Sequence, residues 1–148
     1  MKDRWVRGSI AGIIAGIVMN VVSYISVRIL NFGEDLLSDY AGEMLFGQAP
    51  EALFEASIAL FAHIIWTGFI GILFSYLLLI IGSKYILYKG WLFSLILWFI
   101  LYSVGILFEV PLLKMNSAAT ITSNIITATV YGILLGAFIQ NFNKKIQT

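Results

Sequence analysis

Four long runs of mainly apolar residues without Asp, Glu, Lys or Arg divide this chain. They extend from Gly8 to Val27, from Ala56 to Ser83, from Gly90 to Phe108 and from Met115 to Asn143. A helix needs about 20 such residues to cross a bilayer. The pattern therefore predicts an all-α polytopic membrane protein, a four-transmembrane-helix bundle that forms one domain over residues 1–148, with spans at about 6–30, 51–82, 88–110 and 116–142.

The connection between the first two spans, from about Asn31 to Pro50, has a different pattern. Apolar residues recur in it at helical spacing and acidic residues occupy the other face, which predicts a short amphipathic helix on the outer side. Interfacial helices are usually basic, so the acidic face favours a helix that caps the bundle over one that lies on the membrane surface. The apolar set is Leu36, Leu37, Tyr40, Met44 and Leu45, and the acidic set is Glu34, Asp35, Asp39 and Glu43.

Small residues form a ridge at every fourth position in the first and last spans. Such ridges let helix backbones approach closely in lipid, where packing drives helix association. We expect the first and last spans to pack antiparallel, ridge against ridge, with Asn20 near Asn124 and able to hydrogen-bond to it. The alternative is that either ridge forms a homodimer. The ridges are Gly8, Gly12, Gly16 and Asn20, and then Asn124, Ala128, Gly132, Gly136 and Gln140.

Composition narrows the class further. Of the 148 residues 60% are hydrophobic and 11% are charged, whereas a soluble domain has about 25% charged residues. Without cysteine the chain has no disulfide or cysteine metal site, and its single histidine leaves a metal or haem site short of nitrogen ligands. The net charge of +1 argues against nucleic acid as a partner. Because the motifs of soluble enzymes are also missing, we expect a protein that is not an enzyme and has no cofactor.

The positions of lysine and arginine predict the orientation. Cytoplasmic loops carry an excess of these residues. Only Arg28 and Lys114 fall on one side of the predicted spans, so we expect both termini on the opposite, cytoplasmic side. The first span has a basic start but is longer than a signal peptide's apolar region, and no small-residue cleavage site follows it, so we expect it to be retained. The basic residues of the inner side are Lys2, Arg4, Arg7, Lys84, Lys89, Lys144 and Lys145.

One ionisable residue lies well inside a span, His63, with Thr67 four residues later and Glu55 eight residues earlier. Ionisable groups in a membrane are costly and often functional. The functional interpretation is a proton relay or ligand contact between His63 and a carboxylate. The structural interpretation is a neutral imidazole that is hydrogen-bonded to a neighbouring helix.

Other polar residues gather at a similar depth in the outer half. They predict either a polar pocket open to the exterior or a set of satisfied pairs, in which Arg28 pairs with Glu109 or Glu55 and the hydroxyl groups bond to carbonyls of their own helices. The set comprises Asn20, Tyr24, Arg28, Tyr102, Ser103, Glu109, Thr120, Thr122, Ser123, Asn124 and Thr127.

The second half of the chain resembles YqhR-type small membrane proteins of spore-forming bacteria. The residues that carry this resemblance are Lys89-Gly90, Leu97-Trp98, Pro111, Thr120, Ser123, Ile125-Ile126-Thr127, Tyr131-Gly132 and Gly136. The N-terminal Gly-x-Ile-Ala-Gly from Gly8 to Gly12, with the later Met19-Asn20, also resembles YagU-type proteins. The resemblance implies a small protein of the bacterial cytoplasmic (inner) membrane and no catalytic or binding residues.

The sequence thus favours a non-enzymatic accessory protein, or a component associated with envelope stress or transport. Its partners would be the lipid bilayer and either a second copy or another membrane protein. The alternative is a small-molecule or proton transporter that uses His63, Glu55 and Glu109. A holin-like pore-former is a weaker alternative, because the polar residues do not extend over the full membrane depth.

Overall fold

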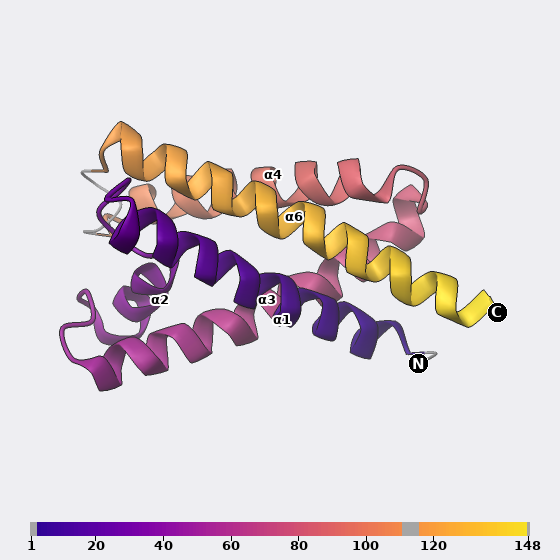
Figure 1. Cartoon of the computed structure of the whole chain (residues 1–148), viewed down its shortest axis with the longest axis horizontal. Coiled ribbons are helices and arrows are strands. Elements are labelled where there is room, and N and C mark those ends of the chain that lie inside the picture. The colour runs from indigo at the N-terminus through magenta and orange to yellow at the C-terminus, as the bar shows by residue number, and fades with distance from the viewer. Residues whose placement is uncertain (1–2, 111–115, 148) are drawn as a thin grey trace.

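The computed structural model describes residues 3–110 and 116–147, and for residues 145–147 only the backbone. Within these ranges the chain is helical and contains no strand. Helix α1 (Arg4–Tyr24) continues as the π-helical turn η1 (Ile25–Ile29). The remaining helices are α2 (Leu37–Phe46), α3 (Leu53–Ile81), α4 (Ile86–Leu107) and α6 (Ala118–Gln147). The start of α1, the end of α6 and the α3–α4 connection lie at one end of the bundle, and α2 lies at the other end (Figure 1).

Four helical segments are long and apolar enough to cross a membrane: Arg4–Ile29, Leu53–Ile81, Ile86–Leu107 and Ala118–Lys144. This confirms the predicted all-α bundle of four membrane-spanning helices, and the architecture fits a multi-pass membrane protein. Many large apolar side chains lie on the outside of the bundle, in positions that a soluble protein fills with charged residues. This is why the chain has so few charged residues. Trp66, Phe99 and Leu79, for example, are between 44% and 65% exposed in the isolated chain.

The first seam joins α1 to α3 through glycine on both helices. A Cβ atom on Gly12 would clash with the carbonyl oxygen of Thr67 and would lie 3.1 Å from the Cα of Gly68. A Cβ atom on Gly71 would lie 2.8 Å from the Cα of Gly12. The two backbones are therefore in direct contact, and even a methyl group would push the helices apart.

A second seam of the same kind joins α4 to α6. Gly90 and Gly132 face each other so closely that a Cβ on either would clash with the carbonyl oxygen of the other, and a Cβ on Gly136 would lie 2.9 Å from the carbonyl oxygen of Ile86. The buried hydroxyl of Ser94 donates a 2.6 Å hydrogen bond to the carbonyl oxygen of Ala128 across this seam. Close approach makes that bond possible.

The predicted ridge-to-ridge pairing of the first and last spans is therefore wrong. The ridge of α1 packs on α3, and the ridge of α6, which includes Ala128, Gly132 and Gly136, packs on α4. The physical reason is that α3 and α4 have small residues of their own, which complement each ridge. Helices α1 and α6 still pack against each other, and both contribute side chains to one apolar core.

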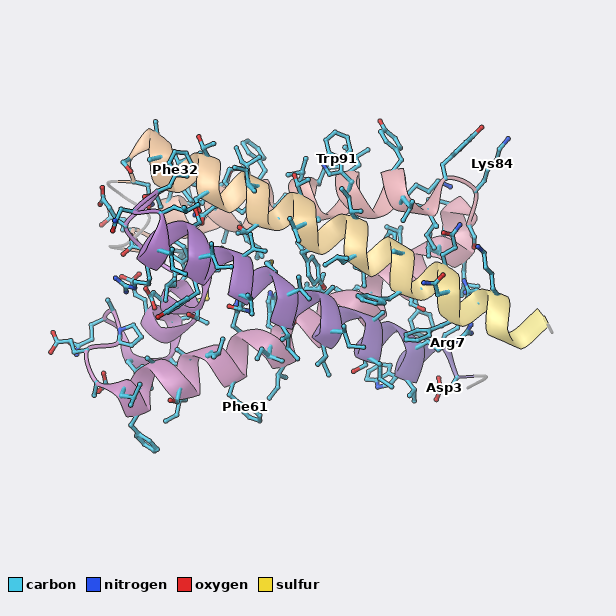
Figure 2. The ribbon with its side chains drawn as sticks, in the orientation of Figure 1. Asp3, Arg7, Phe32, Phe61, Lys84 and Trp91 are labelled. Carbon is cyan, nitrogen blue, oxygen red and sulfur yellow. The ribbon has the colours of Figure 1, made fainter. Side chains whose placement is uncertain are left out.

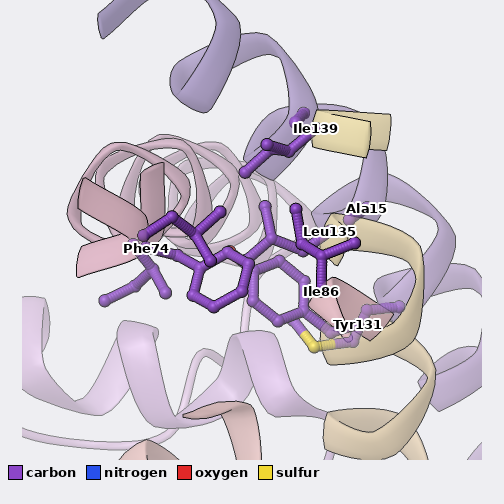
Figure 3. Packing of buried hydrophobic residues seen from close by; sticks show 10 residues of the cluster. Ala15, Phe74, Ile86, Tyr131, Leu135 and Ile139 are labelled. Atoms are coloured by element: carbon purple, nitrogen blue, oxygen red, sulfur yellow. The ribbon is translucent and has the colours of Figure 1, made fainter. Parts of the chain in front are cut away.

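The apolar core lies between the two seams. Phe74 and Leu135 are completely buried there together with Ala11 and Ala15 of α1 (Figure 3). Tyr131 lies in the same cluster, and its hydroxyl donates a 2.7 Å hydrogen bond to the carbonyl oxygen of Thr67. One side chain of α6 thus links the α4–α6 pair to the α1–α3 pair.

Helix α2 occurs where the sequence predicts a short helix, and it packs on α3 and α1 at one end of the bundle. The predicted faces are only partly right. Ser38, Gly42 and Glu43 are buried, whereas Met44 and Leu45 are 67% and 53% exposed. Gly42 explains the difference, because a Cβ at that position would clash with the ring of Pro50 and lie 3.1 Å from the Cβ of Ala59. Close packing at Gly42 turns the two apolar residues outward.

Candidate functional site

Several polar residues lie near the end of α1, where the helix widens into η1, in the half of the bundle that contains α2. The hydroxyl of Ser26 donates to the carbonyl oxygen of Phe32 at 3.0 Å and lies 2.7 Å from the hydroxyl of Ser123 on α6. Phe32 belongs to the turn that leads from η1 towards α2, at the end of the bundle opposite the start of α1 and the end of α6 (Figure 2). Ser26 therefore ties this turn to α6.

Tyr40 of α2 is the centre of a second set of hydrogen bonds. Its hydroxyl donates to Oδ1 of Asn116 at 3.1 Å and accepts a 3.3 Å hydrogen bond from Nδ2 of Asn124. The phenol of Tyr102 on α4 also shares a hydrogen bond with Asn116. Burial raises the pKa of the Tyr40 phenol far above its usual value. Tyr40 is thus a neutral hydrogen-bond donor and acceptor. It connects α2 to α6 and, through Asn116, to α4.

Most hydroxyl groups of α6 are also bonded within the bundle. Thr120 accepts a 3.0 Å hydrogen bond from the backbone N–H of Glu34, and its own N–H donates to the Ser117 hydroxyl at the start of the helix. Thr122 and Thr127 donate to carbonyls one turn earlier in α6.

Among the described residues, no buried side-chain nitrogen or oxygen lacks a hydrogen-bond partner. These polar residues therefore form a network in which every described buried side-chain group has a hydrogen-bond partner, and we call it the closed network. Asn20 and Tyr24, which the sequence predicts as candidates for lining a polar pocket, line a separate cavity.

His63 contacts α1. Its Nδ1 lies 3.0 Å from Oδ1 of Asn20, while Nδ2 of Asn20 donates a 2.8 Å hydrogen bond to the carbonyl oxygen of Gly16. Since the Asn20 amide donates through nitrogen, its oxygen must accept, and His63 therefore carries its proton on Nδ1. A neutral imidazole satisfies this geometry. Asn20 thus pairs with His63 and not with Asn124.

The carboxylates named with His63 lie elsewhere. Glu55 is at the start of α3, where its Oε2 accepts hydrogen bonds of 3.1 and 3.4 Å from the backbone N–H groups of Glu51 and Ala52. It therefore caps the helix. Glu109 is exposed beyond the end of α4, with a positive φ of 60°. The structure does not bring either carboxylate to the imidazole.

Two further candidates, Tyr24 and Arg28, lie on the exposed side of α1 and η1. Burial and then the negative charges of Asp39 and Glu34 raise the pKa of the Asp35 carboxyl above its usual value. The positive charge of Arg28 offsets this rise only in part. Glu55, one of the two expected partners of Arg28, instead bonds to backbone N–H groups at the start of α3.

A cavity of about 300 Å³ lies beside the His63–Asn20 contact. Its wall is mostly apolar and comes from α1, α3 and the start of α2. Its apolar residues include Ile17, Leu60 and Ile64, and Asn20 is one of its few polar residues. The cavity suits an apolar occupant such as a lipid chain better than a charged solute.

A second cavity, of about 450 Å³, lies at the opposite end of the bundle and is lined by Arg4, Arg7 and Lys144. Sequence reasoning missed it, because these cations were assigned to orientation alone. Gln140, Asn143 and Lys144 are spaced so that they share one side of the last helix. This polar side, together with the basic N-terminal residues, could have indicated the cavity.

Comparison with known proteins gives no family. The chain matches no protein-family model, no curated protein and no solved structure. Within residues 3–110 and 116–147, no group of three or more His, Asp or Glu side chains gathers in a way that would hold a metal ion. The arguments about function therefore depend on the geometry of this chain.

Proposed function

We propose that this chain is a non-enzymatic component of the bacterial cytoplasmic membrane, an accessory protein or one associated with envelope stress or transport. The observation that carries the proposal is the closed network at the outer end, in which Tyr40 of α2 joins Asn116 and Asn124. A transport pathway through that end would have to break this network. The resemblance to YqhR-type and YagU-type proteins agrees with such a role, and a second copy or another membrane protein would be its partner.

The charge distribution supports an orientation with both termini in the cytoplasm. The end of the bundle with the starts of α1 and α4 and the end of α6 carries Arg4, Arg7, Lys84, Lys89 and Lys144 (Figure 1). Six of the eight acidic residues lie between Glu34 and Glu55, at the other end. Cytoplasmic excess of lysine and arginine is the general rule for such proteins.

Reporter fusions test this orientation. We expect green fluorescent protein fused after Thr148 to fluoresce, because it would fold in the cytoplasm. We expect alkaline phosphatase inserted between Gly47 and Pro50 to be active, because it would be exported. The two fusions control each other, and the reverse pair of results would contradict the proposed orientation.

A transporter is the second candidate, and one observation favours it. His63 is an ionisable residue in a spanning helix, and its partner Asn20 lines the 300 Å³ cavity. Proton movement through this site would require the imidazole to give up its hydrogen bond to Asn20. That step could be coupled to an occupant of the cavity.

Proteoliposomes that contain a pH-sensitive dye separate the two candidates. The accessory role predicts proton flux no faster than in protein-free vesicles, at either sign of the membrane potential, and no difference between the wild type and His63→Gln. Proton flux that is lost in His63→Gln but kept in Phe61→Leu, a change at an exposed position of the same helix, would establish the transporter and overturn the accessory role. Leakage of a large trapped dye would instead indicate a holin-like pore.

A further inference from the structure

The 450 Å³ cavity at the basic end of the bundle has the chemistry of an anion site. It is open to the surroundings, and helices α1 and α6 supply most of its polar wall. The side chains of that wall are Arg4, Arg7, Ser83, Gln140, Asn143 and Lys144. Arg7, which Figure 2 labels near the start of α1, is only 8% exposed despite its charge.

Among the described residues that line the cavity are cations and neutral donors but no carboxylate. Asp3, the acidic residue nearest to Arg4 in sequence, accepts a 2.8 Å hydrogen bond from the backbone N–H of Trp5 and so caps α1. A guanidinium nitrogen of Arg7 donates to Oδ1 of Asn143. This bond fixes the amide so that its nitrogen is left as a donor. Nε of Arg7 also donates to the backbone carbonyl oxygen of Asp3 at 3.3 Å, so the guanidinium is held in place at the cavity wall.

The need for an inner excess of positive charge does not explain this arrangement. Two other described cations at the same end do not line the cavity: the Nζ atom of Lys84 lies 5.0 Å from the ring centroid of Tyr85, and that of Lys89 donates to the carbonyl oxygens of Ile81 and Gly82 at the end of α3. Orientation alone would be satisfied by cations that extend outward in this way. Arg7 is instead held between α1 and α6.

We propose that this cavity binds the phosphate group of an anionic molecule, with the headgroup of an anionic phospholipid and free inorganic phosphate as the two possible sources. Guanidinium groups bind phosphate through paired hydrogen bonds, and basic pockets between membrane helices on the cytoplasmic side recognise lipid headgroups. The volume exceeds that of one phosphate and accommodates a glycerol phosphate, and Ile86 adds an apolar wall. The inference needs the proposed membrane placement but not the accessory role.

Binding to the full-length protein in detergent micelles tests the site. We expect phosphatidylglycerol to bind and to raise the unfolding temperature, and phosphatidylcholine to do neither. Arg4→Gln and Lys144→Gln should each weaken phosphatidylglycerol binding about fivefold. Lys84→Gln, which removes the same charge from the same end but not from the cavity, should leave binding unchanged. Arg7 is not replaced, because its bond to Asn143 also joins two helices.

Competition with inorganic phosphate distinguishes the two sources. If millimolar phosphate displaces the lipid and by itself stabilises the wild type but not Arg4→Gln, the ligand is free phosphate. If the lipid binds in its presence, the ligand is the headgroup. Equal binding of the two lipids, or equal weakening by Lys84→Gln and Arg4→Gln, would overturn the site. Such a failure is distinct from a failed orientation, which only the reporter fusions would reveal.

Discussion

Replacing Gly12 by valine should lower the free energy of unfolding by about 3 kcal/mol, because overpacking costs of this size follow when a rigid neighbour cannot move away. The atoms around Gly12 are backbone atoms of α3, namely the carbonyl oxygen of Thr67 and the Cα atoms of Gly68 and Gly71. A flexible side chain could rotate away from a new Cβ, but these atoms move only if the whole helix moves. The α1–α3 seam would therefore open along its length.

The measurement is unfolding in mixed micelles, followed by circular dichroism as the fraction of denaturing detergent rises. Gly12→Ala should already show most of the loss, since its single added carbon makes the clash. The matched control is Val21→Leu on the same helix, which adds volume at a residue that is 54% exposed and should change little. Equal stability of Gly12→Val and Val21→Leu would mean that α1 does not contact α3 in this way.

The number and position of the spanning helices could be predicted from the sequence, but the pairing of those helices could not. A run without charged residues is a local property, and lipid requires it to form a helix. A glycine ridge shows which face of a helix packs closely without showing which neighbour it meets. In α3 Ser75 follows Gly71 by four residues, and in α4 Ser94 follows Gly90 by four residues. These pairs are shorter than the two ridges, yet each complements one.

The polar residues in the half of the bundle that contains α2 illustrate the same limit. Its residues could be identified because polar groups in apolar segments are conspicuous, and several of them do share one network. What connects them is Tyr40, which the sequence pattern assigned to the apolar face of α2. A tyrosine fits both roles, because its ring is apolar and its hydroxyl is polar. Only the tertiary contacts with Asn116 and Asn124 reveal the second role.

The pairing of helices across the bundle can be measured directly, because the chain has no cysteine and introduced pairs have no background. The structure predicts a disulfide between Ser9→Cys on α1 and Gly68→Cys on α3, since a Cβ at residue 68 would lie 3.5 Å from the hydroxyl oxygen of Ser9. Such a distance is compatible with the short span of a disulfide. The new Cβ would also lie 2.9 Å from Cγ1 of Ile13, but that neighbour is a side chain that can move, unlike the backbone atoms around Gly12. The competing pairing of α1 with α6 predicts a disulfide between Asn20→Cys and Asn124→Cys instead.

Mild oxidation in native membranes, followed by labelling with a maleimide-linked polymer, counts the thiols that remain. The two-seam bundle predicts that most of the Ser9→Cys, Gly68→Cys chain escapes labelling until it is reduced, while the Asn20→Cys, Asn124→Cys chain takes two labels throughout. Protection of the Asn20 and Asn124 pair, with free thiols at residues 9 and 68, would contradict the arrangement of helices on which the closed network and the basic cavity both depend.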